Sequence, residues 1–212
     1  MTKKERAALA VETLKRRYPQ AQCSLTYQKP HELLIATRLS AQCTDARVNI
    51  VTKDLFAAYP TIDSFAEADA EEIEPYIRPC GLYKTKAKDI VTMCRQLRDE
   101  FHYEMPQTIE ELTSLSGIGR KTANLMLGDI FGKPAVVTDT HCIRICGRLG
   151  LTNEADPYKV EMDLRKILDP KESNDFCHRL VHFGREVCKA RSPQCEGCEC
   201  AEFCKNKGKS KK

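Results

Sequence analysis

The stretch LTSLSGIGRKTANLML (112–127) joins two apolar helical segments across a turn of only four residues, S-G-I-G. Leu115 lies before the turn and Ile118 within it, so both are placed to hold the two helices together. Gly117 and Gly119 permit a tight turn, because glycine tolerates positive φ and lets another chain approach its backbone. Amide groups at such a turn and at the following helix start form an anion site. The stretch therefore predicts either a helix–hairpin–helix that binds a DNA phosphate or an ordinary pair of antiparallel helices.

The rest of the chain also shows helical periodicity, and strand signals are nearly absent. In KAKDIVTMCRQLRDEF (86–101), one helix face is expected to carry Ile90, Val91, Met93, Cys94 and Leu97. The only strand-like run, AVVT (135–138), is expected to be an extended linker. These patterns predict an all-α fold of about ten helices.

The N-terminus, MTKKERAALAVETLKRRYPQ, is positively charged like a signal peptide but has no uninterrupted apolar stretch. Its Ala8, Leu9, Val11 and Leu14 fall at helical spacing and predict an amphipathic helix. No run approaches the roughly 18 uncharged apolar residues that a membrane span needs. We therefore expect no membrane partner and a cytoplasmic location, at the nucleoid if the protein is bacterial. The basic tail KNKGKSKK (205–212) lacks apolar anchors and is expected to be disordered.

Five of the twelve cysteines lie within residues 188–204. Four of them follow the spacing C-x6-C-x2-C-x5-C, with Cys200 inside the last gap. In a reducing compartment, clustered cysteines bind metal more often than they form disulfides. Four thiolates suit either an iron–sulfur cluster or a tetrahedral zinc ion. The spacing therefore indicates a bound metal species, and the net charge of +4 is too small to indicate nucleic acid by itself.

Two residues in or after the hairpin carry side chains that could take part in a reaction. Lys121 is expected in the first turn of the second helix beside Arg120, and both the helix dipole and Arg120 disfavour an ammonium ion there. A neutral lysine is a nucleophile, although simple pairing with a phosphate is equally consistent with the residues. Asp139 follows an apolar run in VVTDTH (136–141). A carboxylate there can deprotonate an amine or stabilise a sugar cation, and it can also cap a helix that starts at Thr140.

In combination, LSGIGRKTAN, TDTH and the cysteine spacing resemble the endonuclease III family of helix–hairpin–helix DNA glycosylases. The similarity includes RLSAQCTD (38–45) and GLYKTKA (81–87) and runs through nearly the whole chain. It implies two helical domains with a cleft between them. Residues 23–133 would form a six-helix domain, and residues 1–22 and 134–212 an iron–sulfur cluster domain.

The resemblance also implies an activity. The protein would be a monomeric, bifunctional DNA glycosylase and AP lyase of base excision repair, acting on double-stranded DNA with oxidised pyrimidines or abasic sites. After base flipping, Lys121 would attack the anomeric carbon of the sugar and form a Schiff base. β-Elimination would then cut the strand 3′ to the abasic site. Asp139 would assist by deprotonating the lysine or by stabilising the sugar cation.

Further residues are assigned to DNA by the same resemblance. Gln42 would fill the gap left by the flipped base, and Leu82 would wedge into the opposite strand. Contacts with DNA phosphates are expected from Gly117, Gly119, Arg120, Lys189 and Arg191.

The resemblance assigns a 4Fe–4S cluster to Cys188, Cys195, Cys198 and Cys204, and it leaves Cys200 as a bystander thiol. The sequence departs from the family at a few positions. Ser116 stands where the family usually has proline, which is expected to loosen the turn. Cys43 replaces a small residue beside Gln42.

Two other functions explain some of these residues but not all of them. A non-catalytic iron–sulfur module for DNA binding or redox sensing explains the cysteines and the hairpin, but it gives Lys121 and Asp139 no joint purpose. The related adenine-mismatch glycosylase has the same cysteine spacing, but it lacks the lysine and has G-N after its aspartate in place of Thr140-His141.

Overall fold

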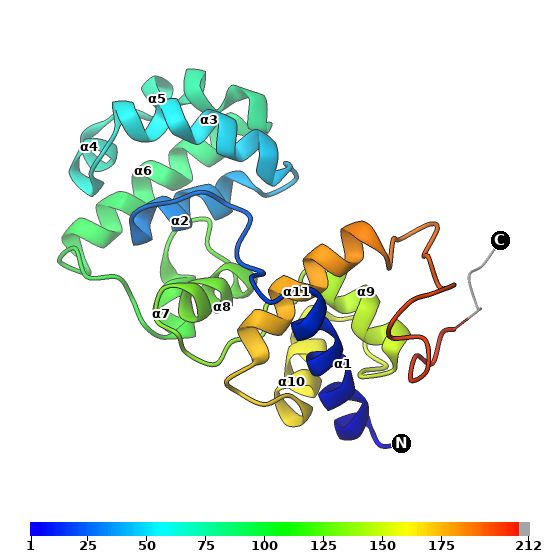
Figure 1. Cartoon of the computed structure of the whole chain (residues 1–212). Helices are drawn as coiled ribbons and strands as arrows, with labels where there is room; N and C mark the ends of the chain where they lie inside the picture. Colours follow the sequence, from blue (N-terminus) through cyan, green and yellow to red (C-terminus); the bar gives the residue numbers. More distant parts are fainter. Residues whose placement is uncertain (208–212) are drawn as a thin grey trace. The chain divides into compact units, whose positions relative to one another are not determined.

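A computed structural model describes residues 1–207 of the 212-residue chain, and this part folds into helices and loops without a β-strand (Figure 1). The predicted all-α class is confirmed, with eleven α-helices and one 3₁₀-helix in the described residues. The chain divides into two compact units, Cys23–Phe131 and Met1–Gln22 with Gly132–Lys212. Disorder is expected for the basic tail (205–212), and residues 208–212 of this tail lie outside the described residues. None of the described helices combines the length and the apolar character needed to cross a membrane.

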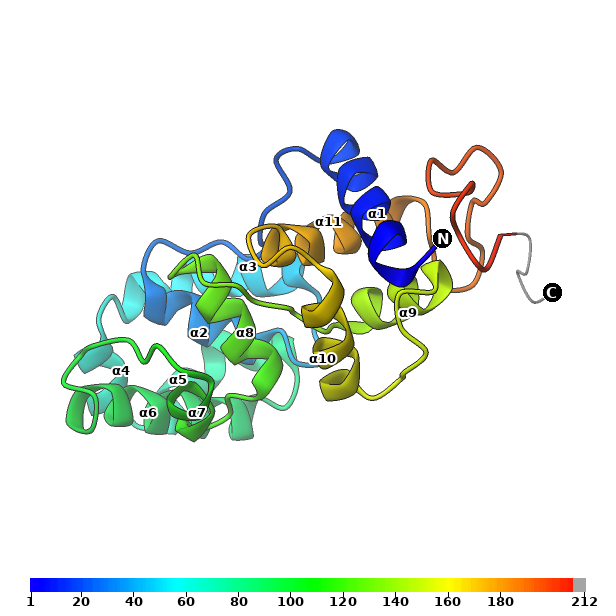
Figure 2. The same cartoon turned by 90° about the horizontal axis from the view of Figure 1, so that it is seen from below.

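The unit Cys23–Phe131 is organised around α6 (Tyr83–Asp99), against which α2, α4 and α5 pack, while α7 packs against α8 (Figure 2). Its other helices are α2 (Pro30–Leu39), α3 (Asp45–Ala58), α4 (Ile62–Glu67), α5 (Ala70–Ile77), η1 (Arg78–Cys80), α7 (Ile109–Ser114) and α8 (Arg120–Asp129). The resemblance implies six helices in this domain, and the described unit has seven α-helices, with Asp69 starting α5 soon after α4 ends.

The inner face of α6 supplies much of this core. Ile90, Met93, Cys94 and Leu97 are fully buried and Val91 is nearly so, as the helical periodicity predicts. On α4, Phe65 is fully buried and stacks on Tyr59 with ring centroids 5.2 Å apart. Apolar burial therefore fixes α4 and α6, two helices that precede the hairpin in the chain.

The second unit contains α1 (Lys3–Arg17), α9 (Thr140–Leu149), α10 (Pro157–Ile167) and α11 (Ser173–Glu186). Helix α11 packs against α1 and α9, and α10 packs against α1 (Figure 1). Arg6 of α1 donates hydrogen bonds to the carbonyl oxygens of Gly150 (3.3 Å) and Phe203 (2.9 Å). The first helix of the chain is thus joined to its last described segment.

The buried face of α1 differs from the expected one. Ala7, Ala10, Val11 and Leu14 are buried, whereas Ala8 and Leu9 are exposed, so the sequence interpretation was right only for Val11 and Leu14. Positions i, i+3, i+4 and i+7 share one helix face, and Ala7, Ala10, Val11 and Leu14 follow this spacing.

The segment before α9 has no helix or strand in residues 132–139, which agrees with the linker that the sequence predicts for AVVT (135–138). Ala135, Val136 and Val137 are buried, although the segment pairs with no other strand in the described residues. The linker therefore delivers Asp139 from the core of this unit to the start of α9.

The two leucines of α1 give a matched test of this packing. Leu14→Ala should lower the free energy of unfolding by about 2–5 kcal/mol, because it opens a cavity at a fully buried side chain. Leu9→Ala should lower it by less than about 1 kcal/mol, since Leu9 is 44% exposed. Urea denaturation followed by circular dichroism measures both, and equal losses would contradict the orientation of α1.

Candidate functional site: a helical hairpin and a cysteine-lined pocket

The turn between α7 and α8 is tight and anchored on the core. The amide of Ile118 donates to the carbonyl oxygen of Leu115 (3.1 Å), and both side chains are buried. Gly117 has a φ of +74°, which favours glycine, and Gly119 is the N-cap of α8. A side chain does not cap this helix end. The turn and the helix start therefore present backbone amides, as a phosphate-binding hairpin requires.

An ion pair fills the space beside Gly117. A Cβ atom at this position would lie 2.6 Å from Nε of Arg38, so any side chain there would force Arg38 to shift. Arg38 donates to Asp89 through Nε (2.7 Å) and Nη2 (2.6 Å). Ser116 donates its hydroxyl to the same carboxylate (3.0 Å) and its amide to the side-chain oxygen of Gln96 (2.8 Å). Proline could make neither bond, so the serine offsets the loosening expected at this position.

Lys121 occupies the first turn of α8, as predicted, and its side chain is exposed. Its neighbour Arg120 is half-buried and is the first residue of the helix. The first amides of any α-helix lack intrahelical acceptors, and the helix dipole is positive at this end. One surface of the hairpin thus combines an exposed amine with a site suited to an anion.

Asp139 is the N-cap of α9. Its Oδ1 accepts a hydrogen bond from the amide of Cys142 (2.7 Å), and its own carbonyl oxygen accepts one from Ile143 (3.0 Å). The carboxylate is half-buried at the end of the buried linker. The capping role considered from the sequence is confirmed, and it engages Oδ1.

The two candidate catalytic residues belong to different units. Lys121 lies in Cys23–Phe131, and Asp139 lies in the unit that contains Gly132. Their meeting at one active site, across the cleft implied by the resemblance, stays a prediction.

Gln42 and Leu82 share an unusual backbone conformation. Their φ angles are +57° and +49°, in the left-handed region that side chains other than glycine rarely occupy. Such a conformation costs on the order of 1–3 kcal/mol, and it persists only where the surrounding structure holds it. Both side chains are exposed, and Leu82 retains 56% of its accessible surface. An exposed leucine on a strained loop fits a residue that acts on a partner.

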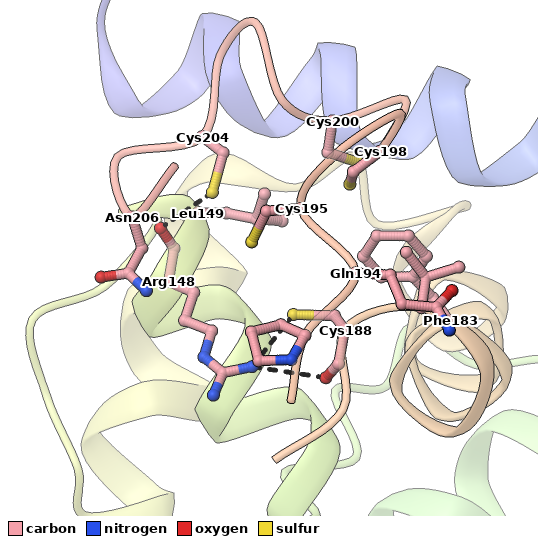
Figure 3. Close-up of a pocket in the computed structure, with 12 residues that line it drawn as sticks. Arg148, Leu149, Phe183, Cys188, Gln194, Cys195, Cys198, Cys200, Cys204 and Asn206 are labelled. Carbon is pink, nitrogen blue, oxygen red and sulfur yellow. Dashed lines mark hydrogen bonds between the residues drawn. The ribbon is translucent and has the colours of Figure 1, made fainter. Parts of the chain in front are cut away.

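The cysteines after α11 surround a small pocket of about 30 Å³ (Figure 3). Its lining includes Cys188, Cys195, Cys198, Cys200 and Cys204, with apolar contributions from Leu149, Phe183, Val187 and Pro193. The amide of Cys198 donates to the carbonyl oxygen of Cys195 (3.4 Å), and Gly197 between them has a φ of +73°. Within residues 1–207, no three His, Cys, Asp or Glu side chains stand in an arrangement that already matches a metal site. The cysteines nevertheless place sulfur donors around a largely apolar pocket, and sulfur is the donor that soft metals prefer.

Arg148 of α9 binds the cysteine loop, and sequence reasoning missed it. Its Nη1 donates to Sγ of Cys188 (3.3 Å) (Figure 3). The same Nη1 donates to the carbonyl oxygen of Lys189 (2.7 Å), and Nη2 donates to that of Ala190 (2.7 Å). The thiol of Cys204 donates to the carbonyl oxygen of Arg148 itself (3.4 Å). Arg148 thereby fixes the backbone that directly follows Cys188. The available signal was an arginine in the last turn of a helix, which is too common to identify a partner.

Cys200 is almost completely buried and lies beside Cys198 (Figure 3). A hydrogen bond from the Cys200 thiol is the main cause that lowers the pKa of Cys198 to about 6. The same contact, together with burial, raises the pKa of Cys200 itself. Cys200 thus supports the thiolate form of its neighbour.

The two basic residues predicted to meet DNA from this loop are exposed. Lys189 and Arg191 follow Cys188, and Arg148 holds the backbone at Lys189 and Ala190. The loop therefore presents both cations from a backbone that is fixed to α9.

Comparisons with known proteins agree with this arrangement. Residues 35–170, more than half of the chain, match the family model described as the HhH-GPD superfamily base excision DNA repair protein. Endonuclease III of Synechocystis sp. is 47% identical over 204 residues, which cover 96% of this chain and 93% of that protein. Endonuclease III of Rickettsia conorii is 40% identical over 186 residues, covering 88% of this chain and 89% of that protein.

Solved structures give the same relationship. A structure described as a trapped endonuclease III–DNA covalent intermediate aligns with a TM-score of 0.92 and 41% identity, covering 99% of this chain and 98% of that one. The chain therefore belongs to the endonuclease III family of the HhH-GPD superfamily, and it is a DNA glycosylase and lyase of base excision repair.

Proposed function

We propose that this protein removes oxidised pyrimidines, such as thymine glycol, from duplex DNA and then cuts the strand 3′ to the abasic site. The observation that carries the proposal is the exposed Lys121 in the first turn of α8, two residues after Gly119 of the turn. A related chain has been captured in a covalent complex with DNA, which supports a nucleophilic side chain in this one. The cytoplasmic location expected from the sequence stays a prediction.

Lys121 is proposed as the nucleophile. Its neutral amine attacks C1′ of the flipped nucleotide, the glycosidic bond breaks, and the base leaves with the bonding electron pair. Loss of a proton from the amine and opening of the sugar ring give an imine between Nζ and C1′. Removal of a C2′ proton then expels the 3′ phosphate, which cuts the strand. Water hydrolyses the imine and restores the lysine.

Asp139 is proposed to act on the same sugar. Its capping bond through Oδ1 orients the carboxylate, and the other oxygen is the one we assign to chemistry. A carboxylate there accepts the proton that the lysine must lose, or it stabilises the positive charge that develops on the sugar. Its half-buried position strengthens either interaction, because the local dielectric constant is lower than that of water.

DNA is proposed to contact several backbone and side-chain groups. The Gly117–Gly119 turn and Arg120 bind a backbone phosphate, and Lys189 and Arg191 bind others. Gln42 fills the gap left by the flipped base and Leu82 wedges into the opposite strand, which their exposure and left-handed backbone support.

A 4Fe–4S cluster is proposed as the resident cofactor. Its ligands would be Cys188, Cys195, Cys198 and Cys204, which line one apolar pocket. When bound, the cluster would cross-link the loop of residues 188–204, and none of the proposed reaction steps uses it. Arg148 and Cys200 donate hydrogen bonds to two of these sulfur atoms, as is usual for groups that support metal ligands.

A non-catalytic redox or DNA-binding module is the competing function. It accounts for the hairpin and the cysteines, but not for an exposed amine at the hairpin together with a strained, exposed Leu82. Covalent trapping separates the two functions directly.

Lys121→Ala should abolish the covalent adduct that borohydride traps between the wild-type protein and duplex DNA containing thymine glycol, because no imine can form. Lys53→Ala removes an exposed lysine from α3 and should leave trapping unchanged. Gel electrophoresis of radiolabelled DNA measures the adduct. Release of the base by the wild type without any adduct would refute the role of Lys121.

Asp139→Asn should lower the rate of base release by about 10²–10⁴-fold while the protein keeps its stability. Asparagine caps helices as well as aspartate does, so the bond to Cys142 survives, but it cannot accept a proton. Asp139→Ala should lose activity and also about 1 kcal/mol of stability. Single-turnover kinetics and thermal unfolding test both variants, and a fully active Asp139→Asn protein would reduce Asp139 to a helix cap.

The purified protein should be brown, absorb near 400 nm and contain about four iron and four sulfide per chain. Cys198→Ser should lose much of this absorbance, whereas Cys23→Ser, a half-buried thiol of the other unit, should keep it. Elemental analysis is the deciding measurement, because zinc without iron would replace the cluster with a tetrahedral ion.

A further inference from the structure

Lys86 is a fully buried lysine that has no role in the chemistry proposed above. It lies in the first turn of α6, and its Nζ donates to the carbonyl oxygens of Leu39 (2.8 Å), Ala41 (2.8 Å) and Cys80 (2.9 Å). A lysine ammonium has three N–H donors, so these three acceptors satisfy all of them. Burial lowers the pKa of Lys86 from its ordinary value, and the nearby Cys80 and Cys43 oppose this.

The three carbonyl groups come from places where the backbone lacks partners. Leu39 is the last residue of α2, and Cys80 is the last residue of η1. Carbonyl groups at a helix C-terminus have no intrahelical donor and carry the negative end of the dipole. One ammonium group therefore caps two helix ends and also holds the loop residue Ala41.

The two strained residues follow these carbonyl groups in sequence. Gln42 comes directly after Ala41, and Leu82 comes two residues after Cys80, across Gly81 with a φ of +68°. In each case a backbone carbonyl group accepts a hydrogen bond from Lys86. One or two residues later, a residue with positive φ carries an exposed side chain. We call residues 40–43 and 80–82 the wedge loops.

We propose that Lys86 is a positioning residue, whose buried ammonium group holds both wedge loops in the conformation that presents Gln42 and Leu82 to DNA. This rests on the proposed function for the DNA roles of those two side chains. An apolar residue of equal length would fill the same space but leave three carbonyl groups without donors. The loops would then rearrange toward water, and the left-handed conformations would lose their support.

Lys86→Met tests the proposal, with Lys88→Met as the control because Lys88 is exposed on the same helix. Release of thymine glycol from duplex DNA should fall by about 10–100-fold in Lys86→Met, since loss of placement alone has effects of this size. Borohydride trapping at a preformed abasic site in single-stranded DNA should change by less than about threefold, because no base has to be displaced from a duplex. Equal losses in both assays, or none in the first, would overturn the proposal.

A double-mutant comparison asks whether Lys86 acts through the wedge residues. In a Gln42→Ala/Leu82→Ala background, Lys86→Met should cause no further loss of base release, whereas independent effects would multiply. A further loss equal to that in the wild type would show that Lys86 acts by another route. Lys86→Gln, which retains two donors, replaces the methionine variant if the latter does not fold.

Hydrogen exchange separates this proposal from the proposed function, because it needs no DNA and no activity. The amides of Cys43 and Gly81 donate to the carbonyl oxygens of Ser40 (3.1 Å) and Arg78 (3.2 Å). Their exchange should accelerate by about tenfold or more in Lys86→Met, while amides of α3 keep their rates. Unchanged exchange at Cys43 and Gly81 would overturn the positioning role even in an active enzyme. A wild type with no activity on damaged DNA would instead refute the proposed function.

Discussion

The ion pair between Arg38 and Asp89 supports the backbone conformation of the hairpin turn. The position of Lys121 depends on that conformation, because α8 starts where the turn ends. Arg38 fills the space that a side chain at position 117 would need, and Asp89 binds the hydroxyl of Ser116. Both charged groups are largely shielded from water, with 15% and 19% of their side chains exposed. Removing one partner of such a pair leaves an uncompensated charge, so the pair specifies one geometry for the turn. The start of α8 follows from that geometry.

Helix ends carry most of the candidate functional groups in this protein. Gly119 starts α8 without a capping side chain, Asp139 caps α9, and Lys86 binds the ends of α2 and η1. Backbone groups at helix ends lack partners, and they are therefore available to orient side chains or to bind anions. The candidate functional groups therefore lie where the helical hydrogen-bond pattern ends.

Local patterns predicted much of this arrangement and failed where tertiary contacts decide. The inner face of α6 follows from the spacing of its apolar residues, and the capping role of Asp139 follows from its place before a helical segment. For α1 the same reasoning placed Ala8 and Leu9 inside, because it did not recognise the i, i+3, i+4, i+7 spacing that Ala7, Ala10, Val11 and Leu14 follow. Arg148 and Lys86 were missed, since exposed and buried basic residues look alike in sequence.

The sequence by itself determined the helical class, the two-glycine turn with Lys121 two residues beyond it, and the spacing of the cysteines. Each depends on residues close together in the chain, whose spacing and backbone preferences act locally. Only the tertiary structure decided that Lys86 joins Leu39 to Cys80 and that Arg148 reaches Cys188. The bonds from Lys86 to Leu39 and from Arg148 to Cys188 join residues 47 and 40 positions apart in the chain. Packing alone brings the buried ammonium group of Lys86 to the carbonyl groups that its burial requires.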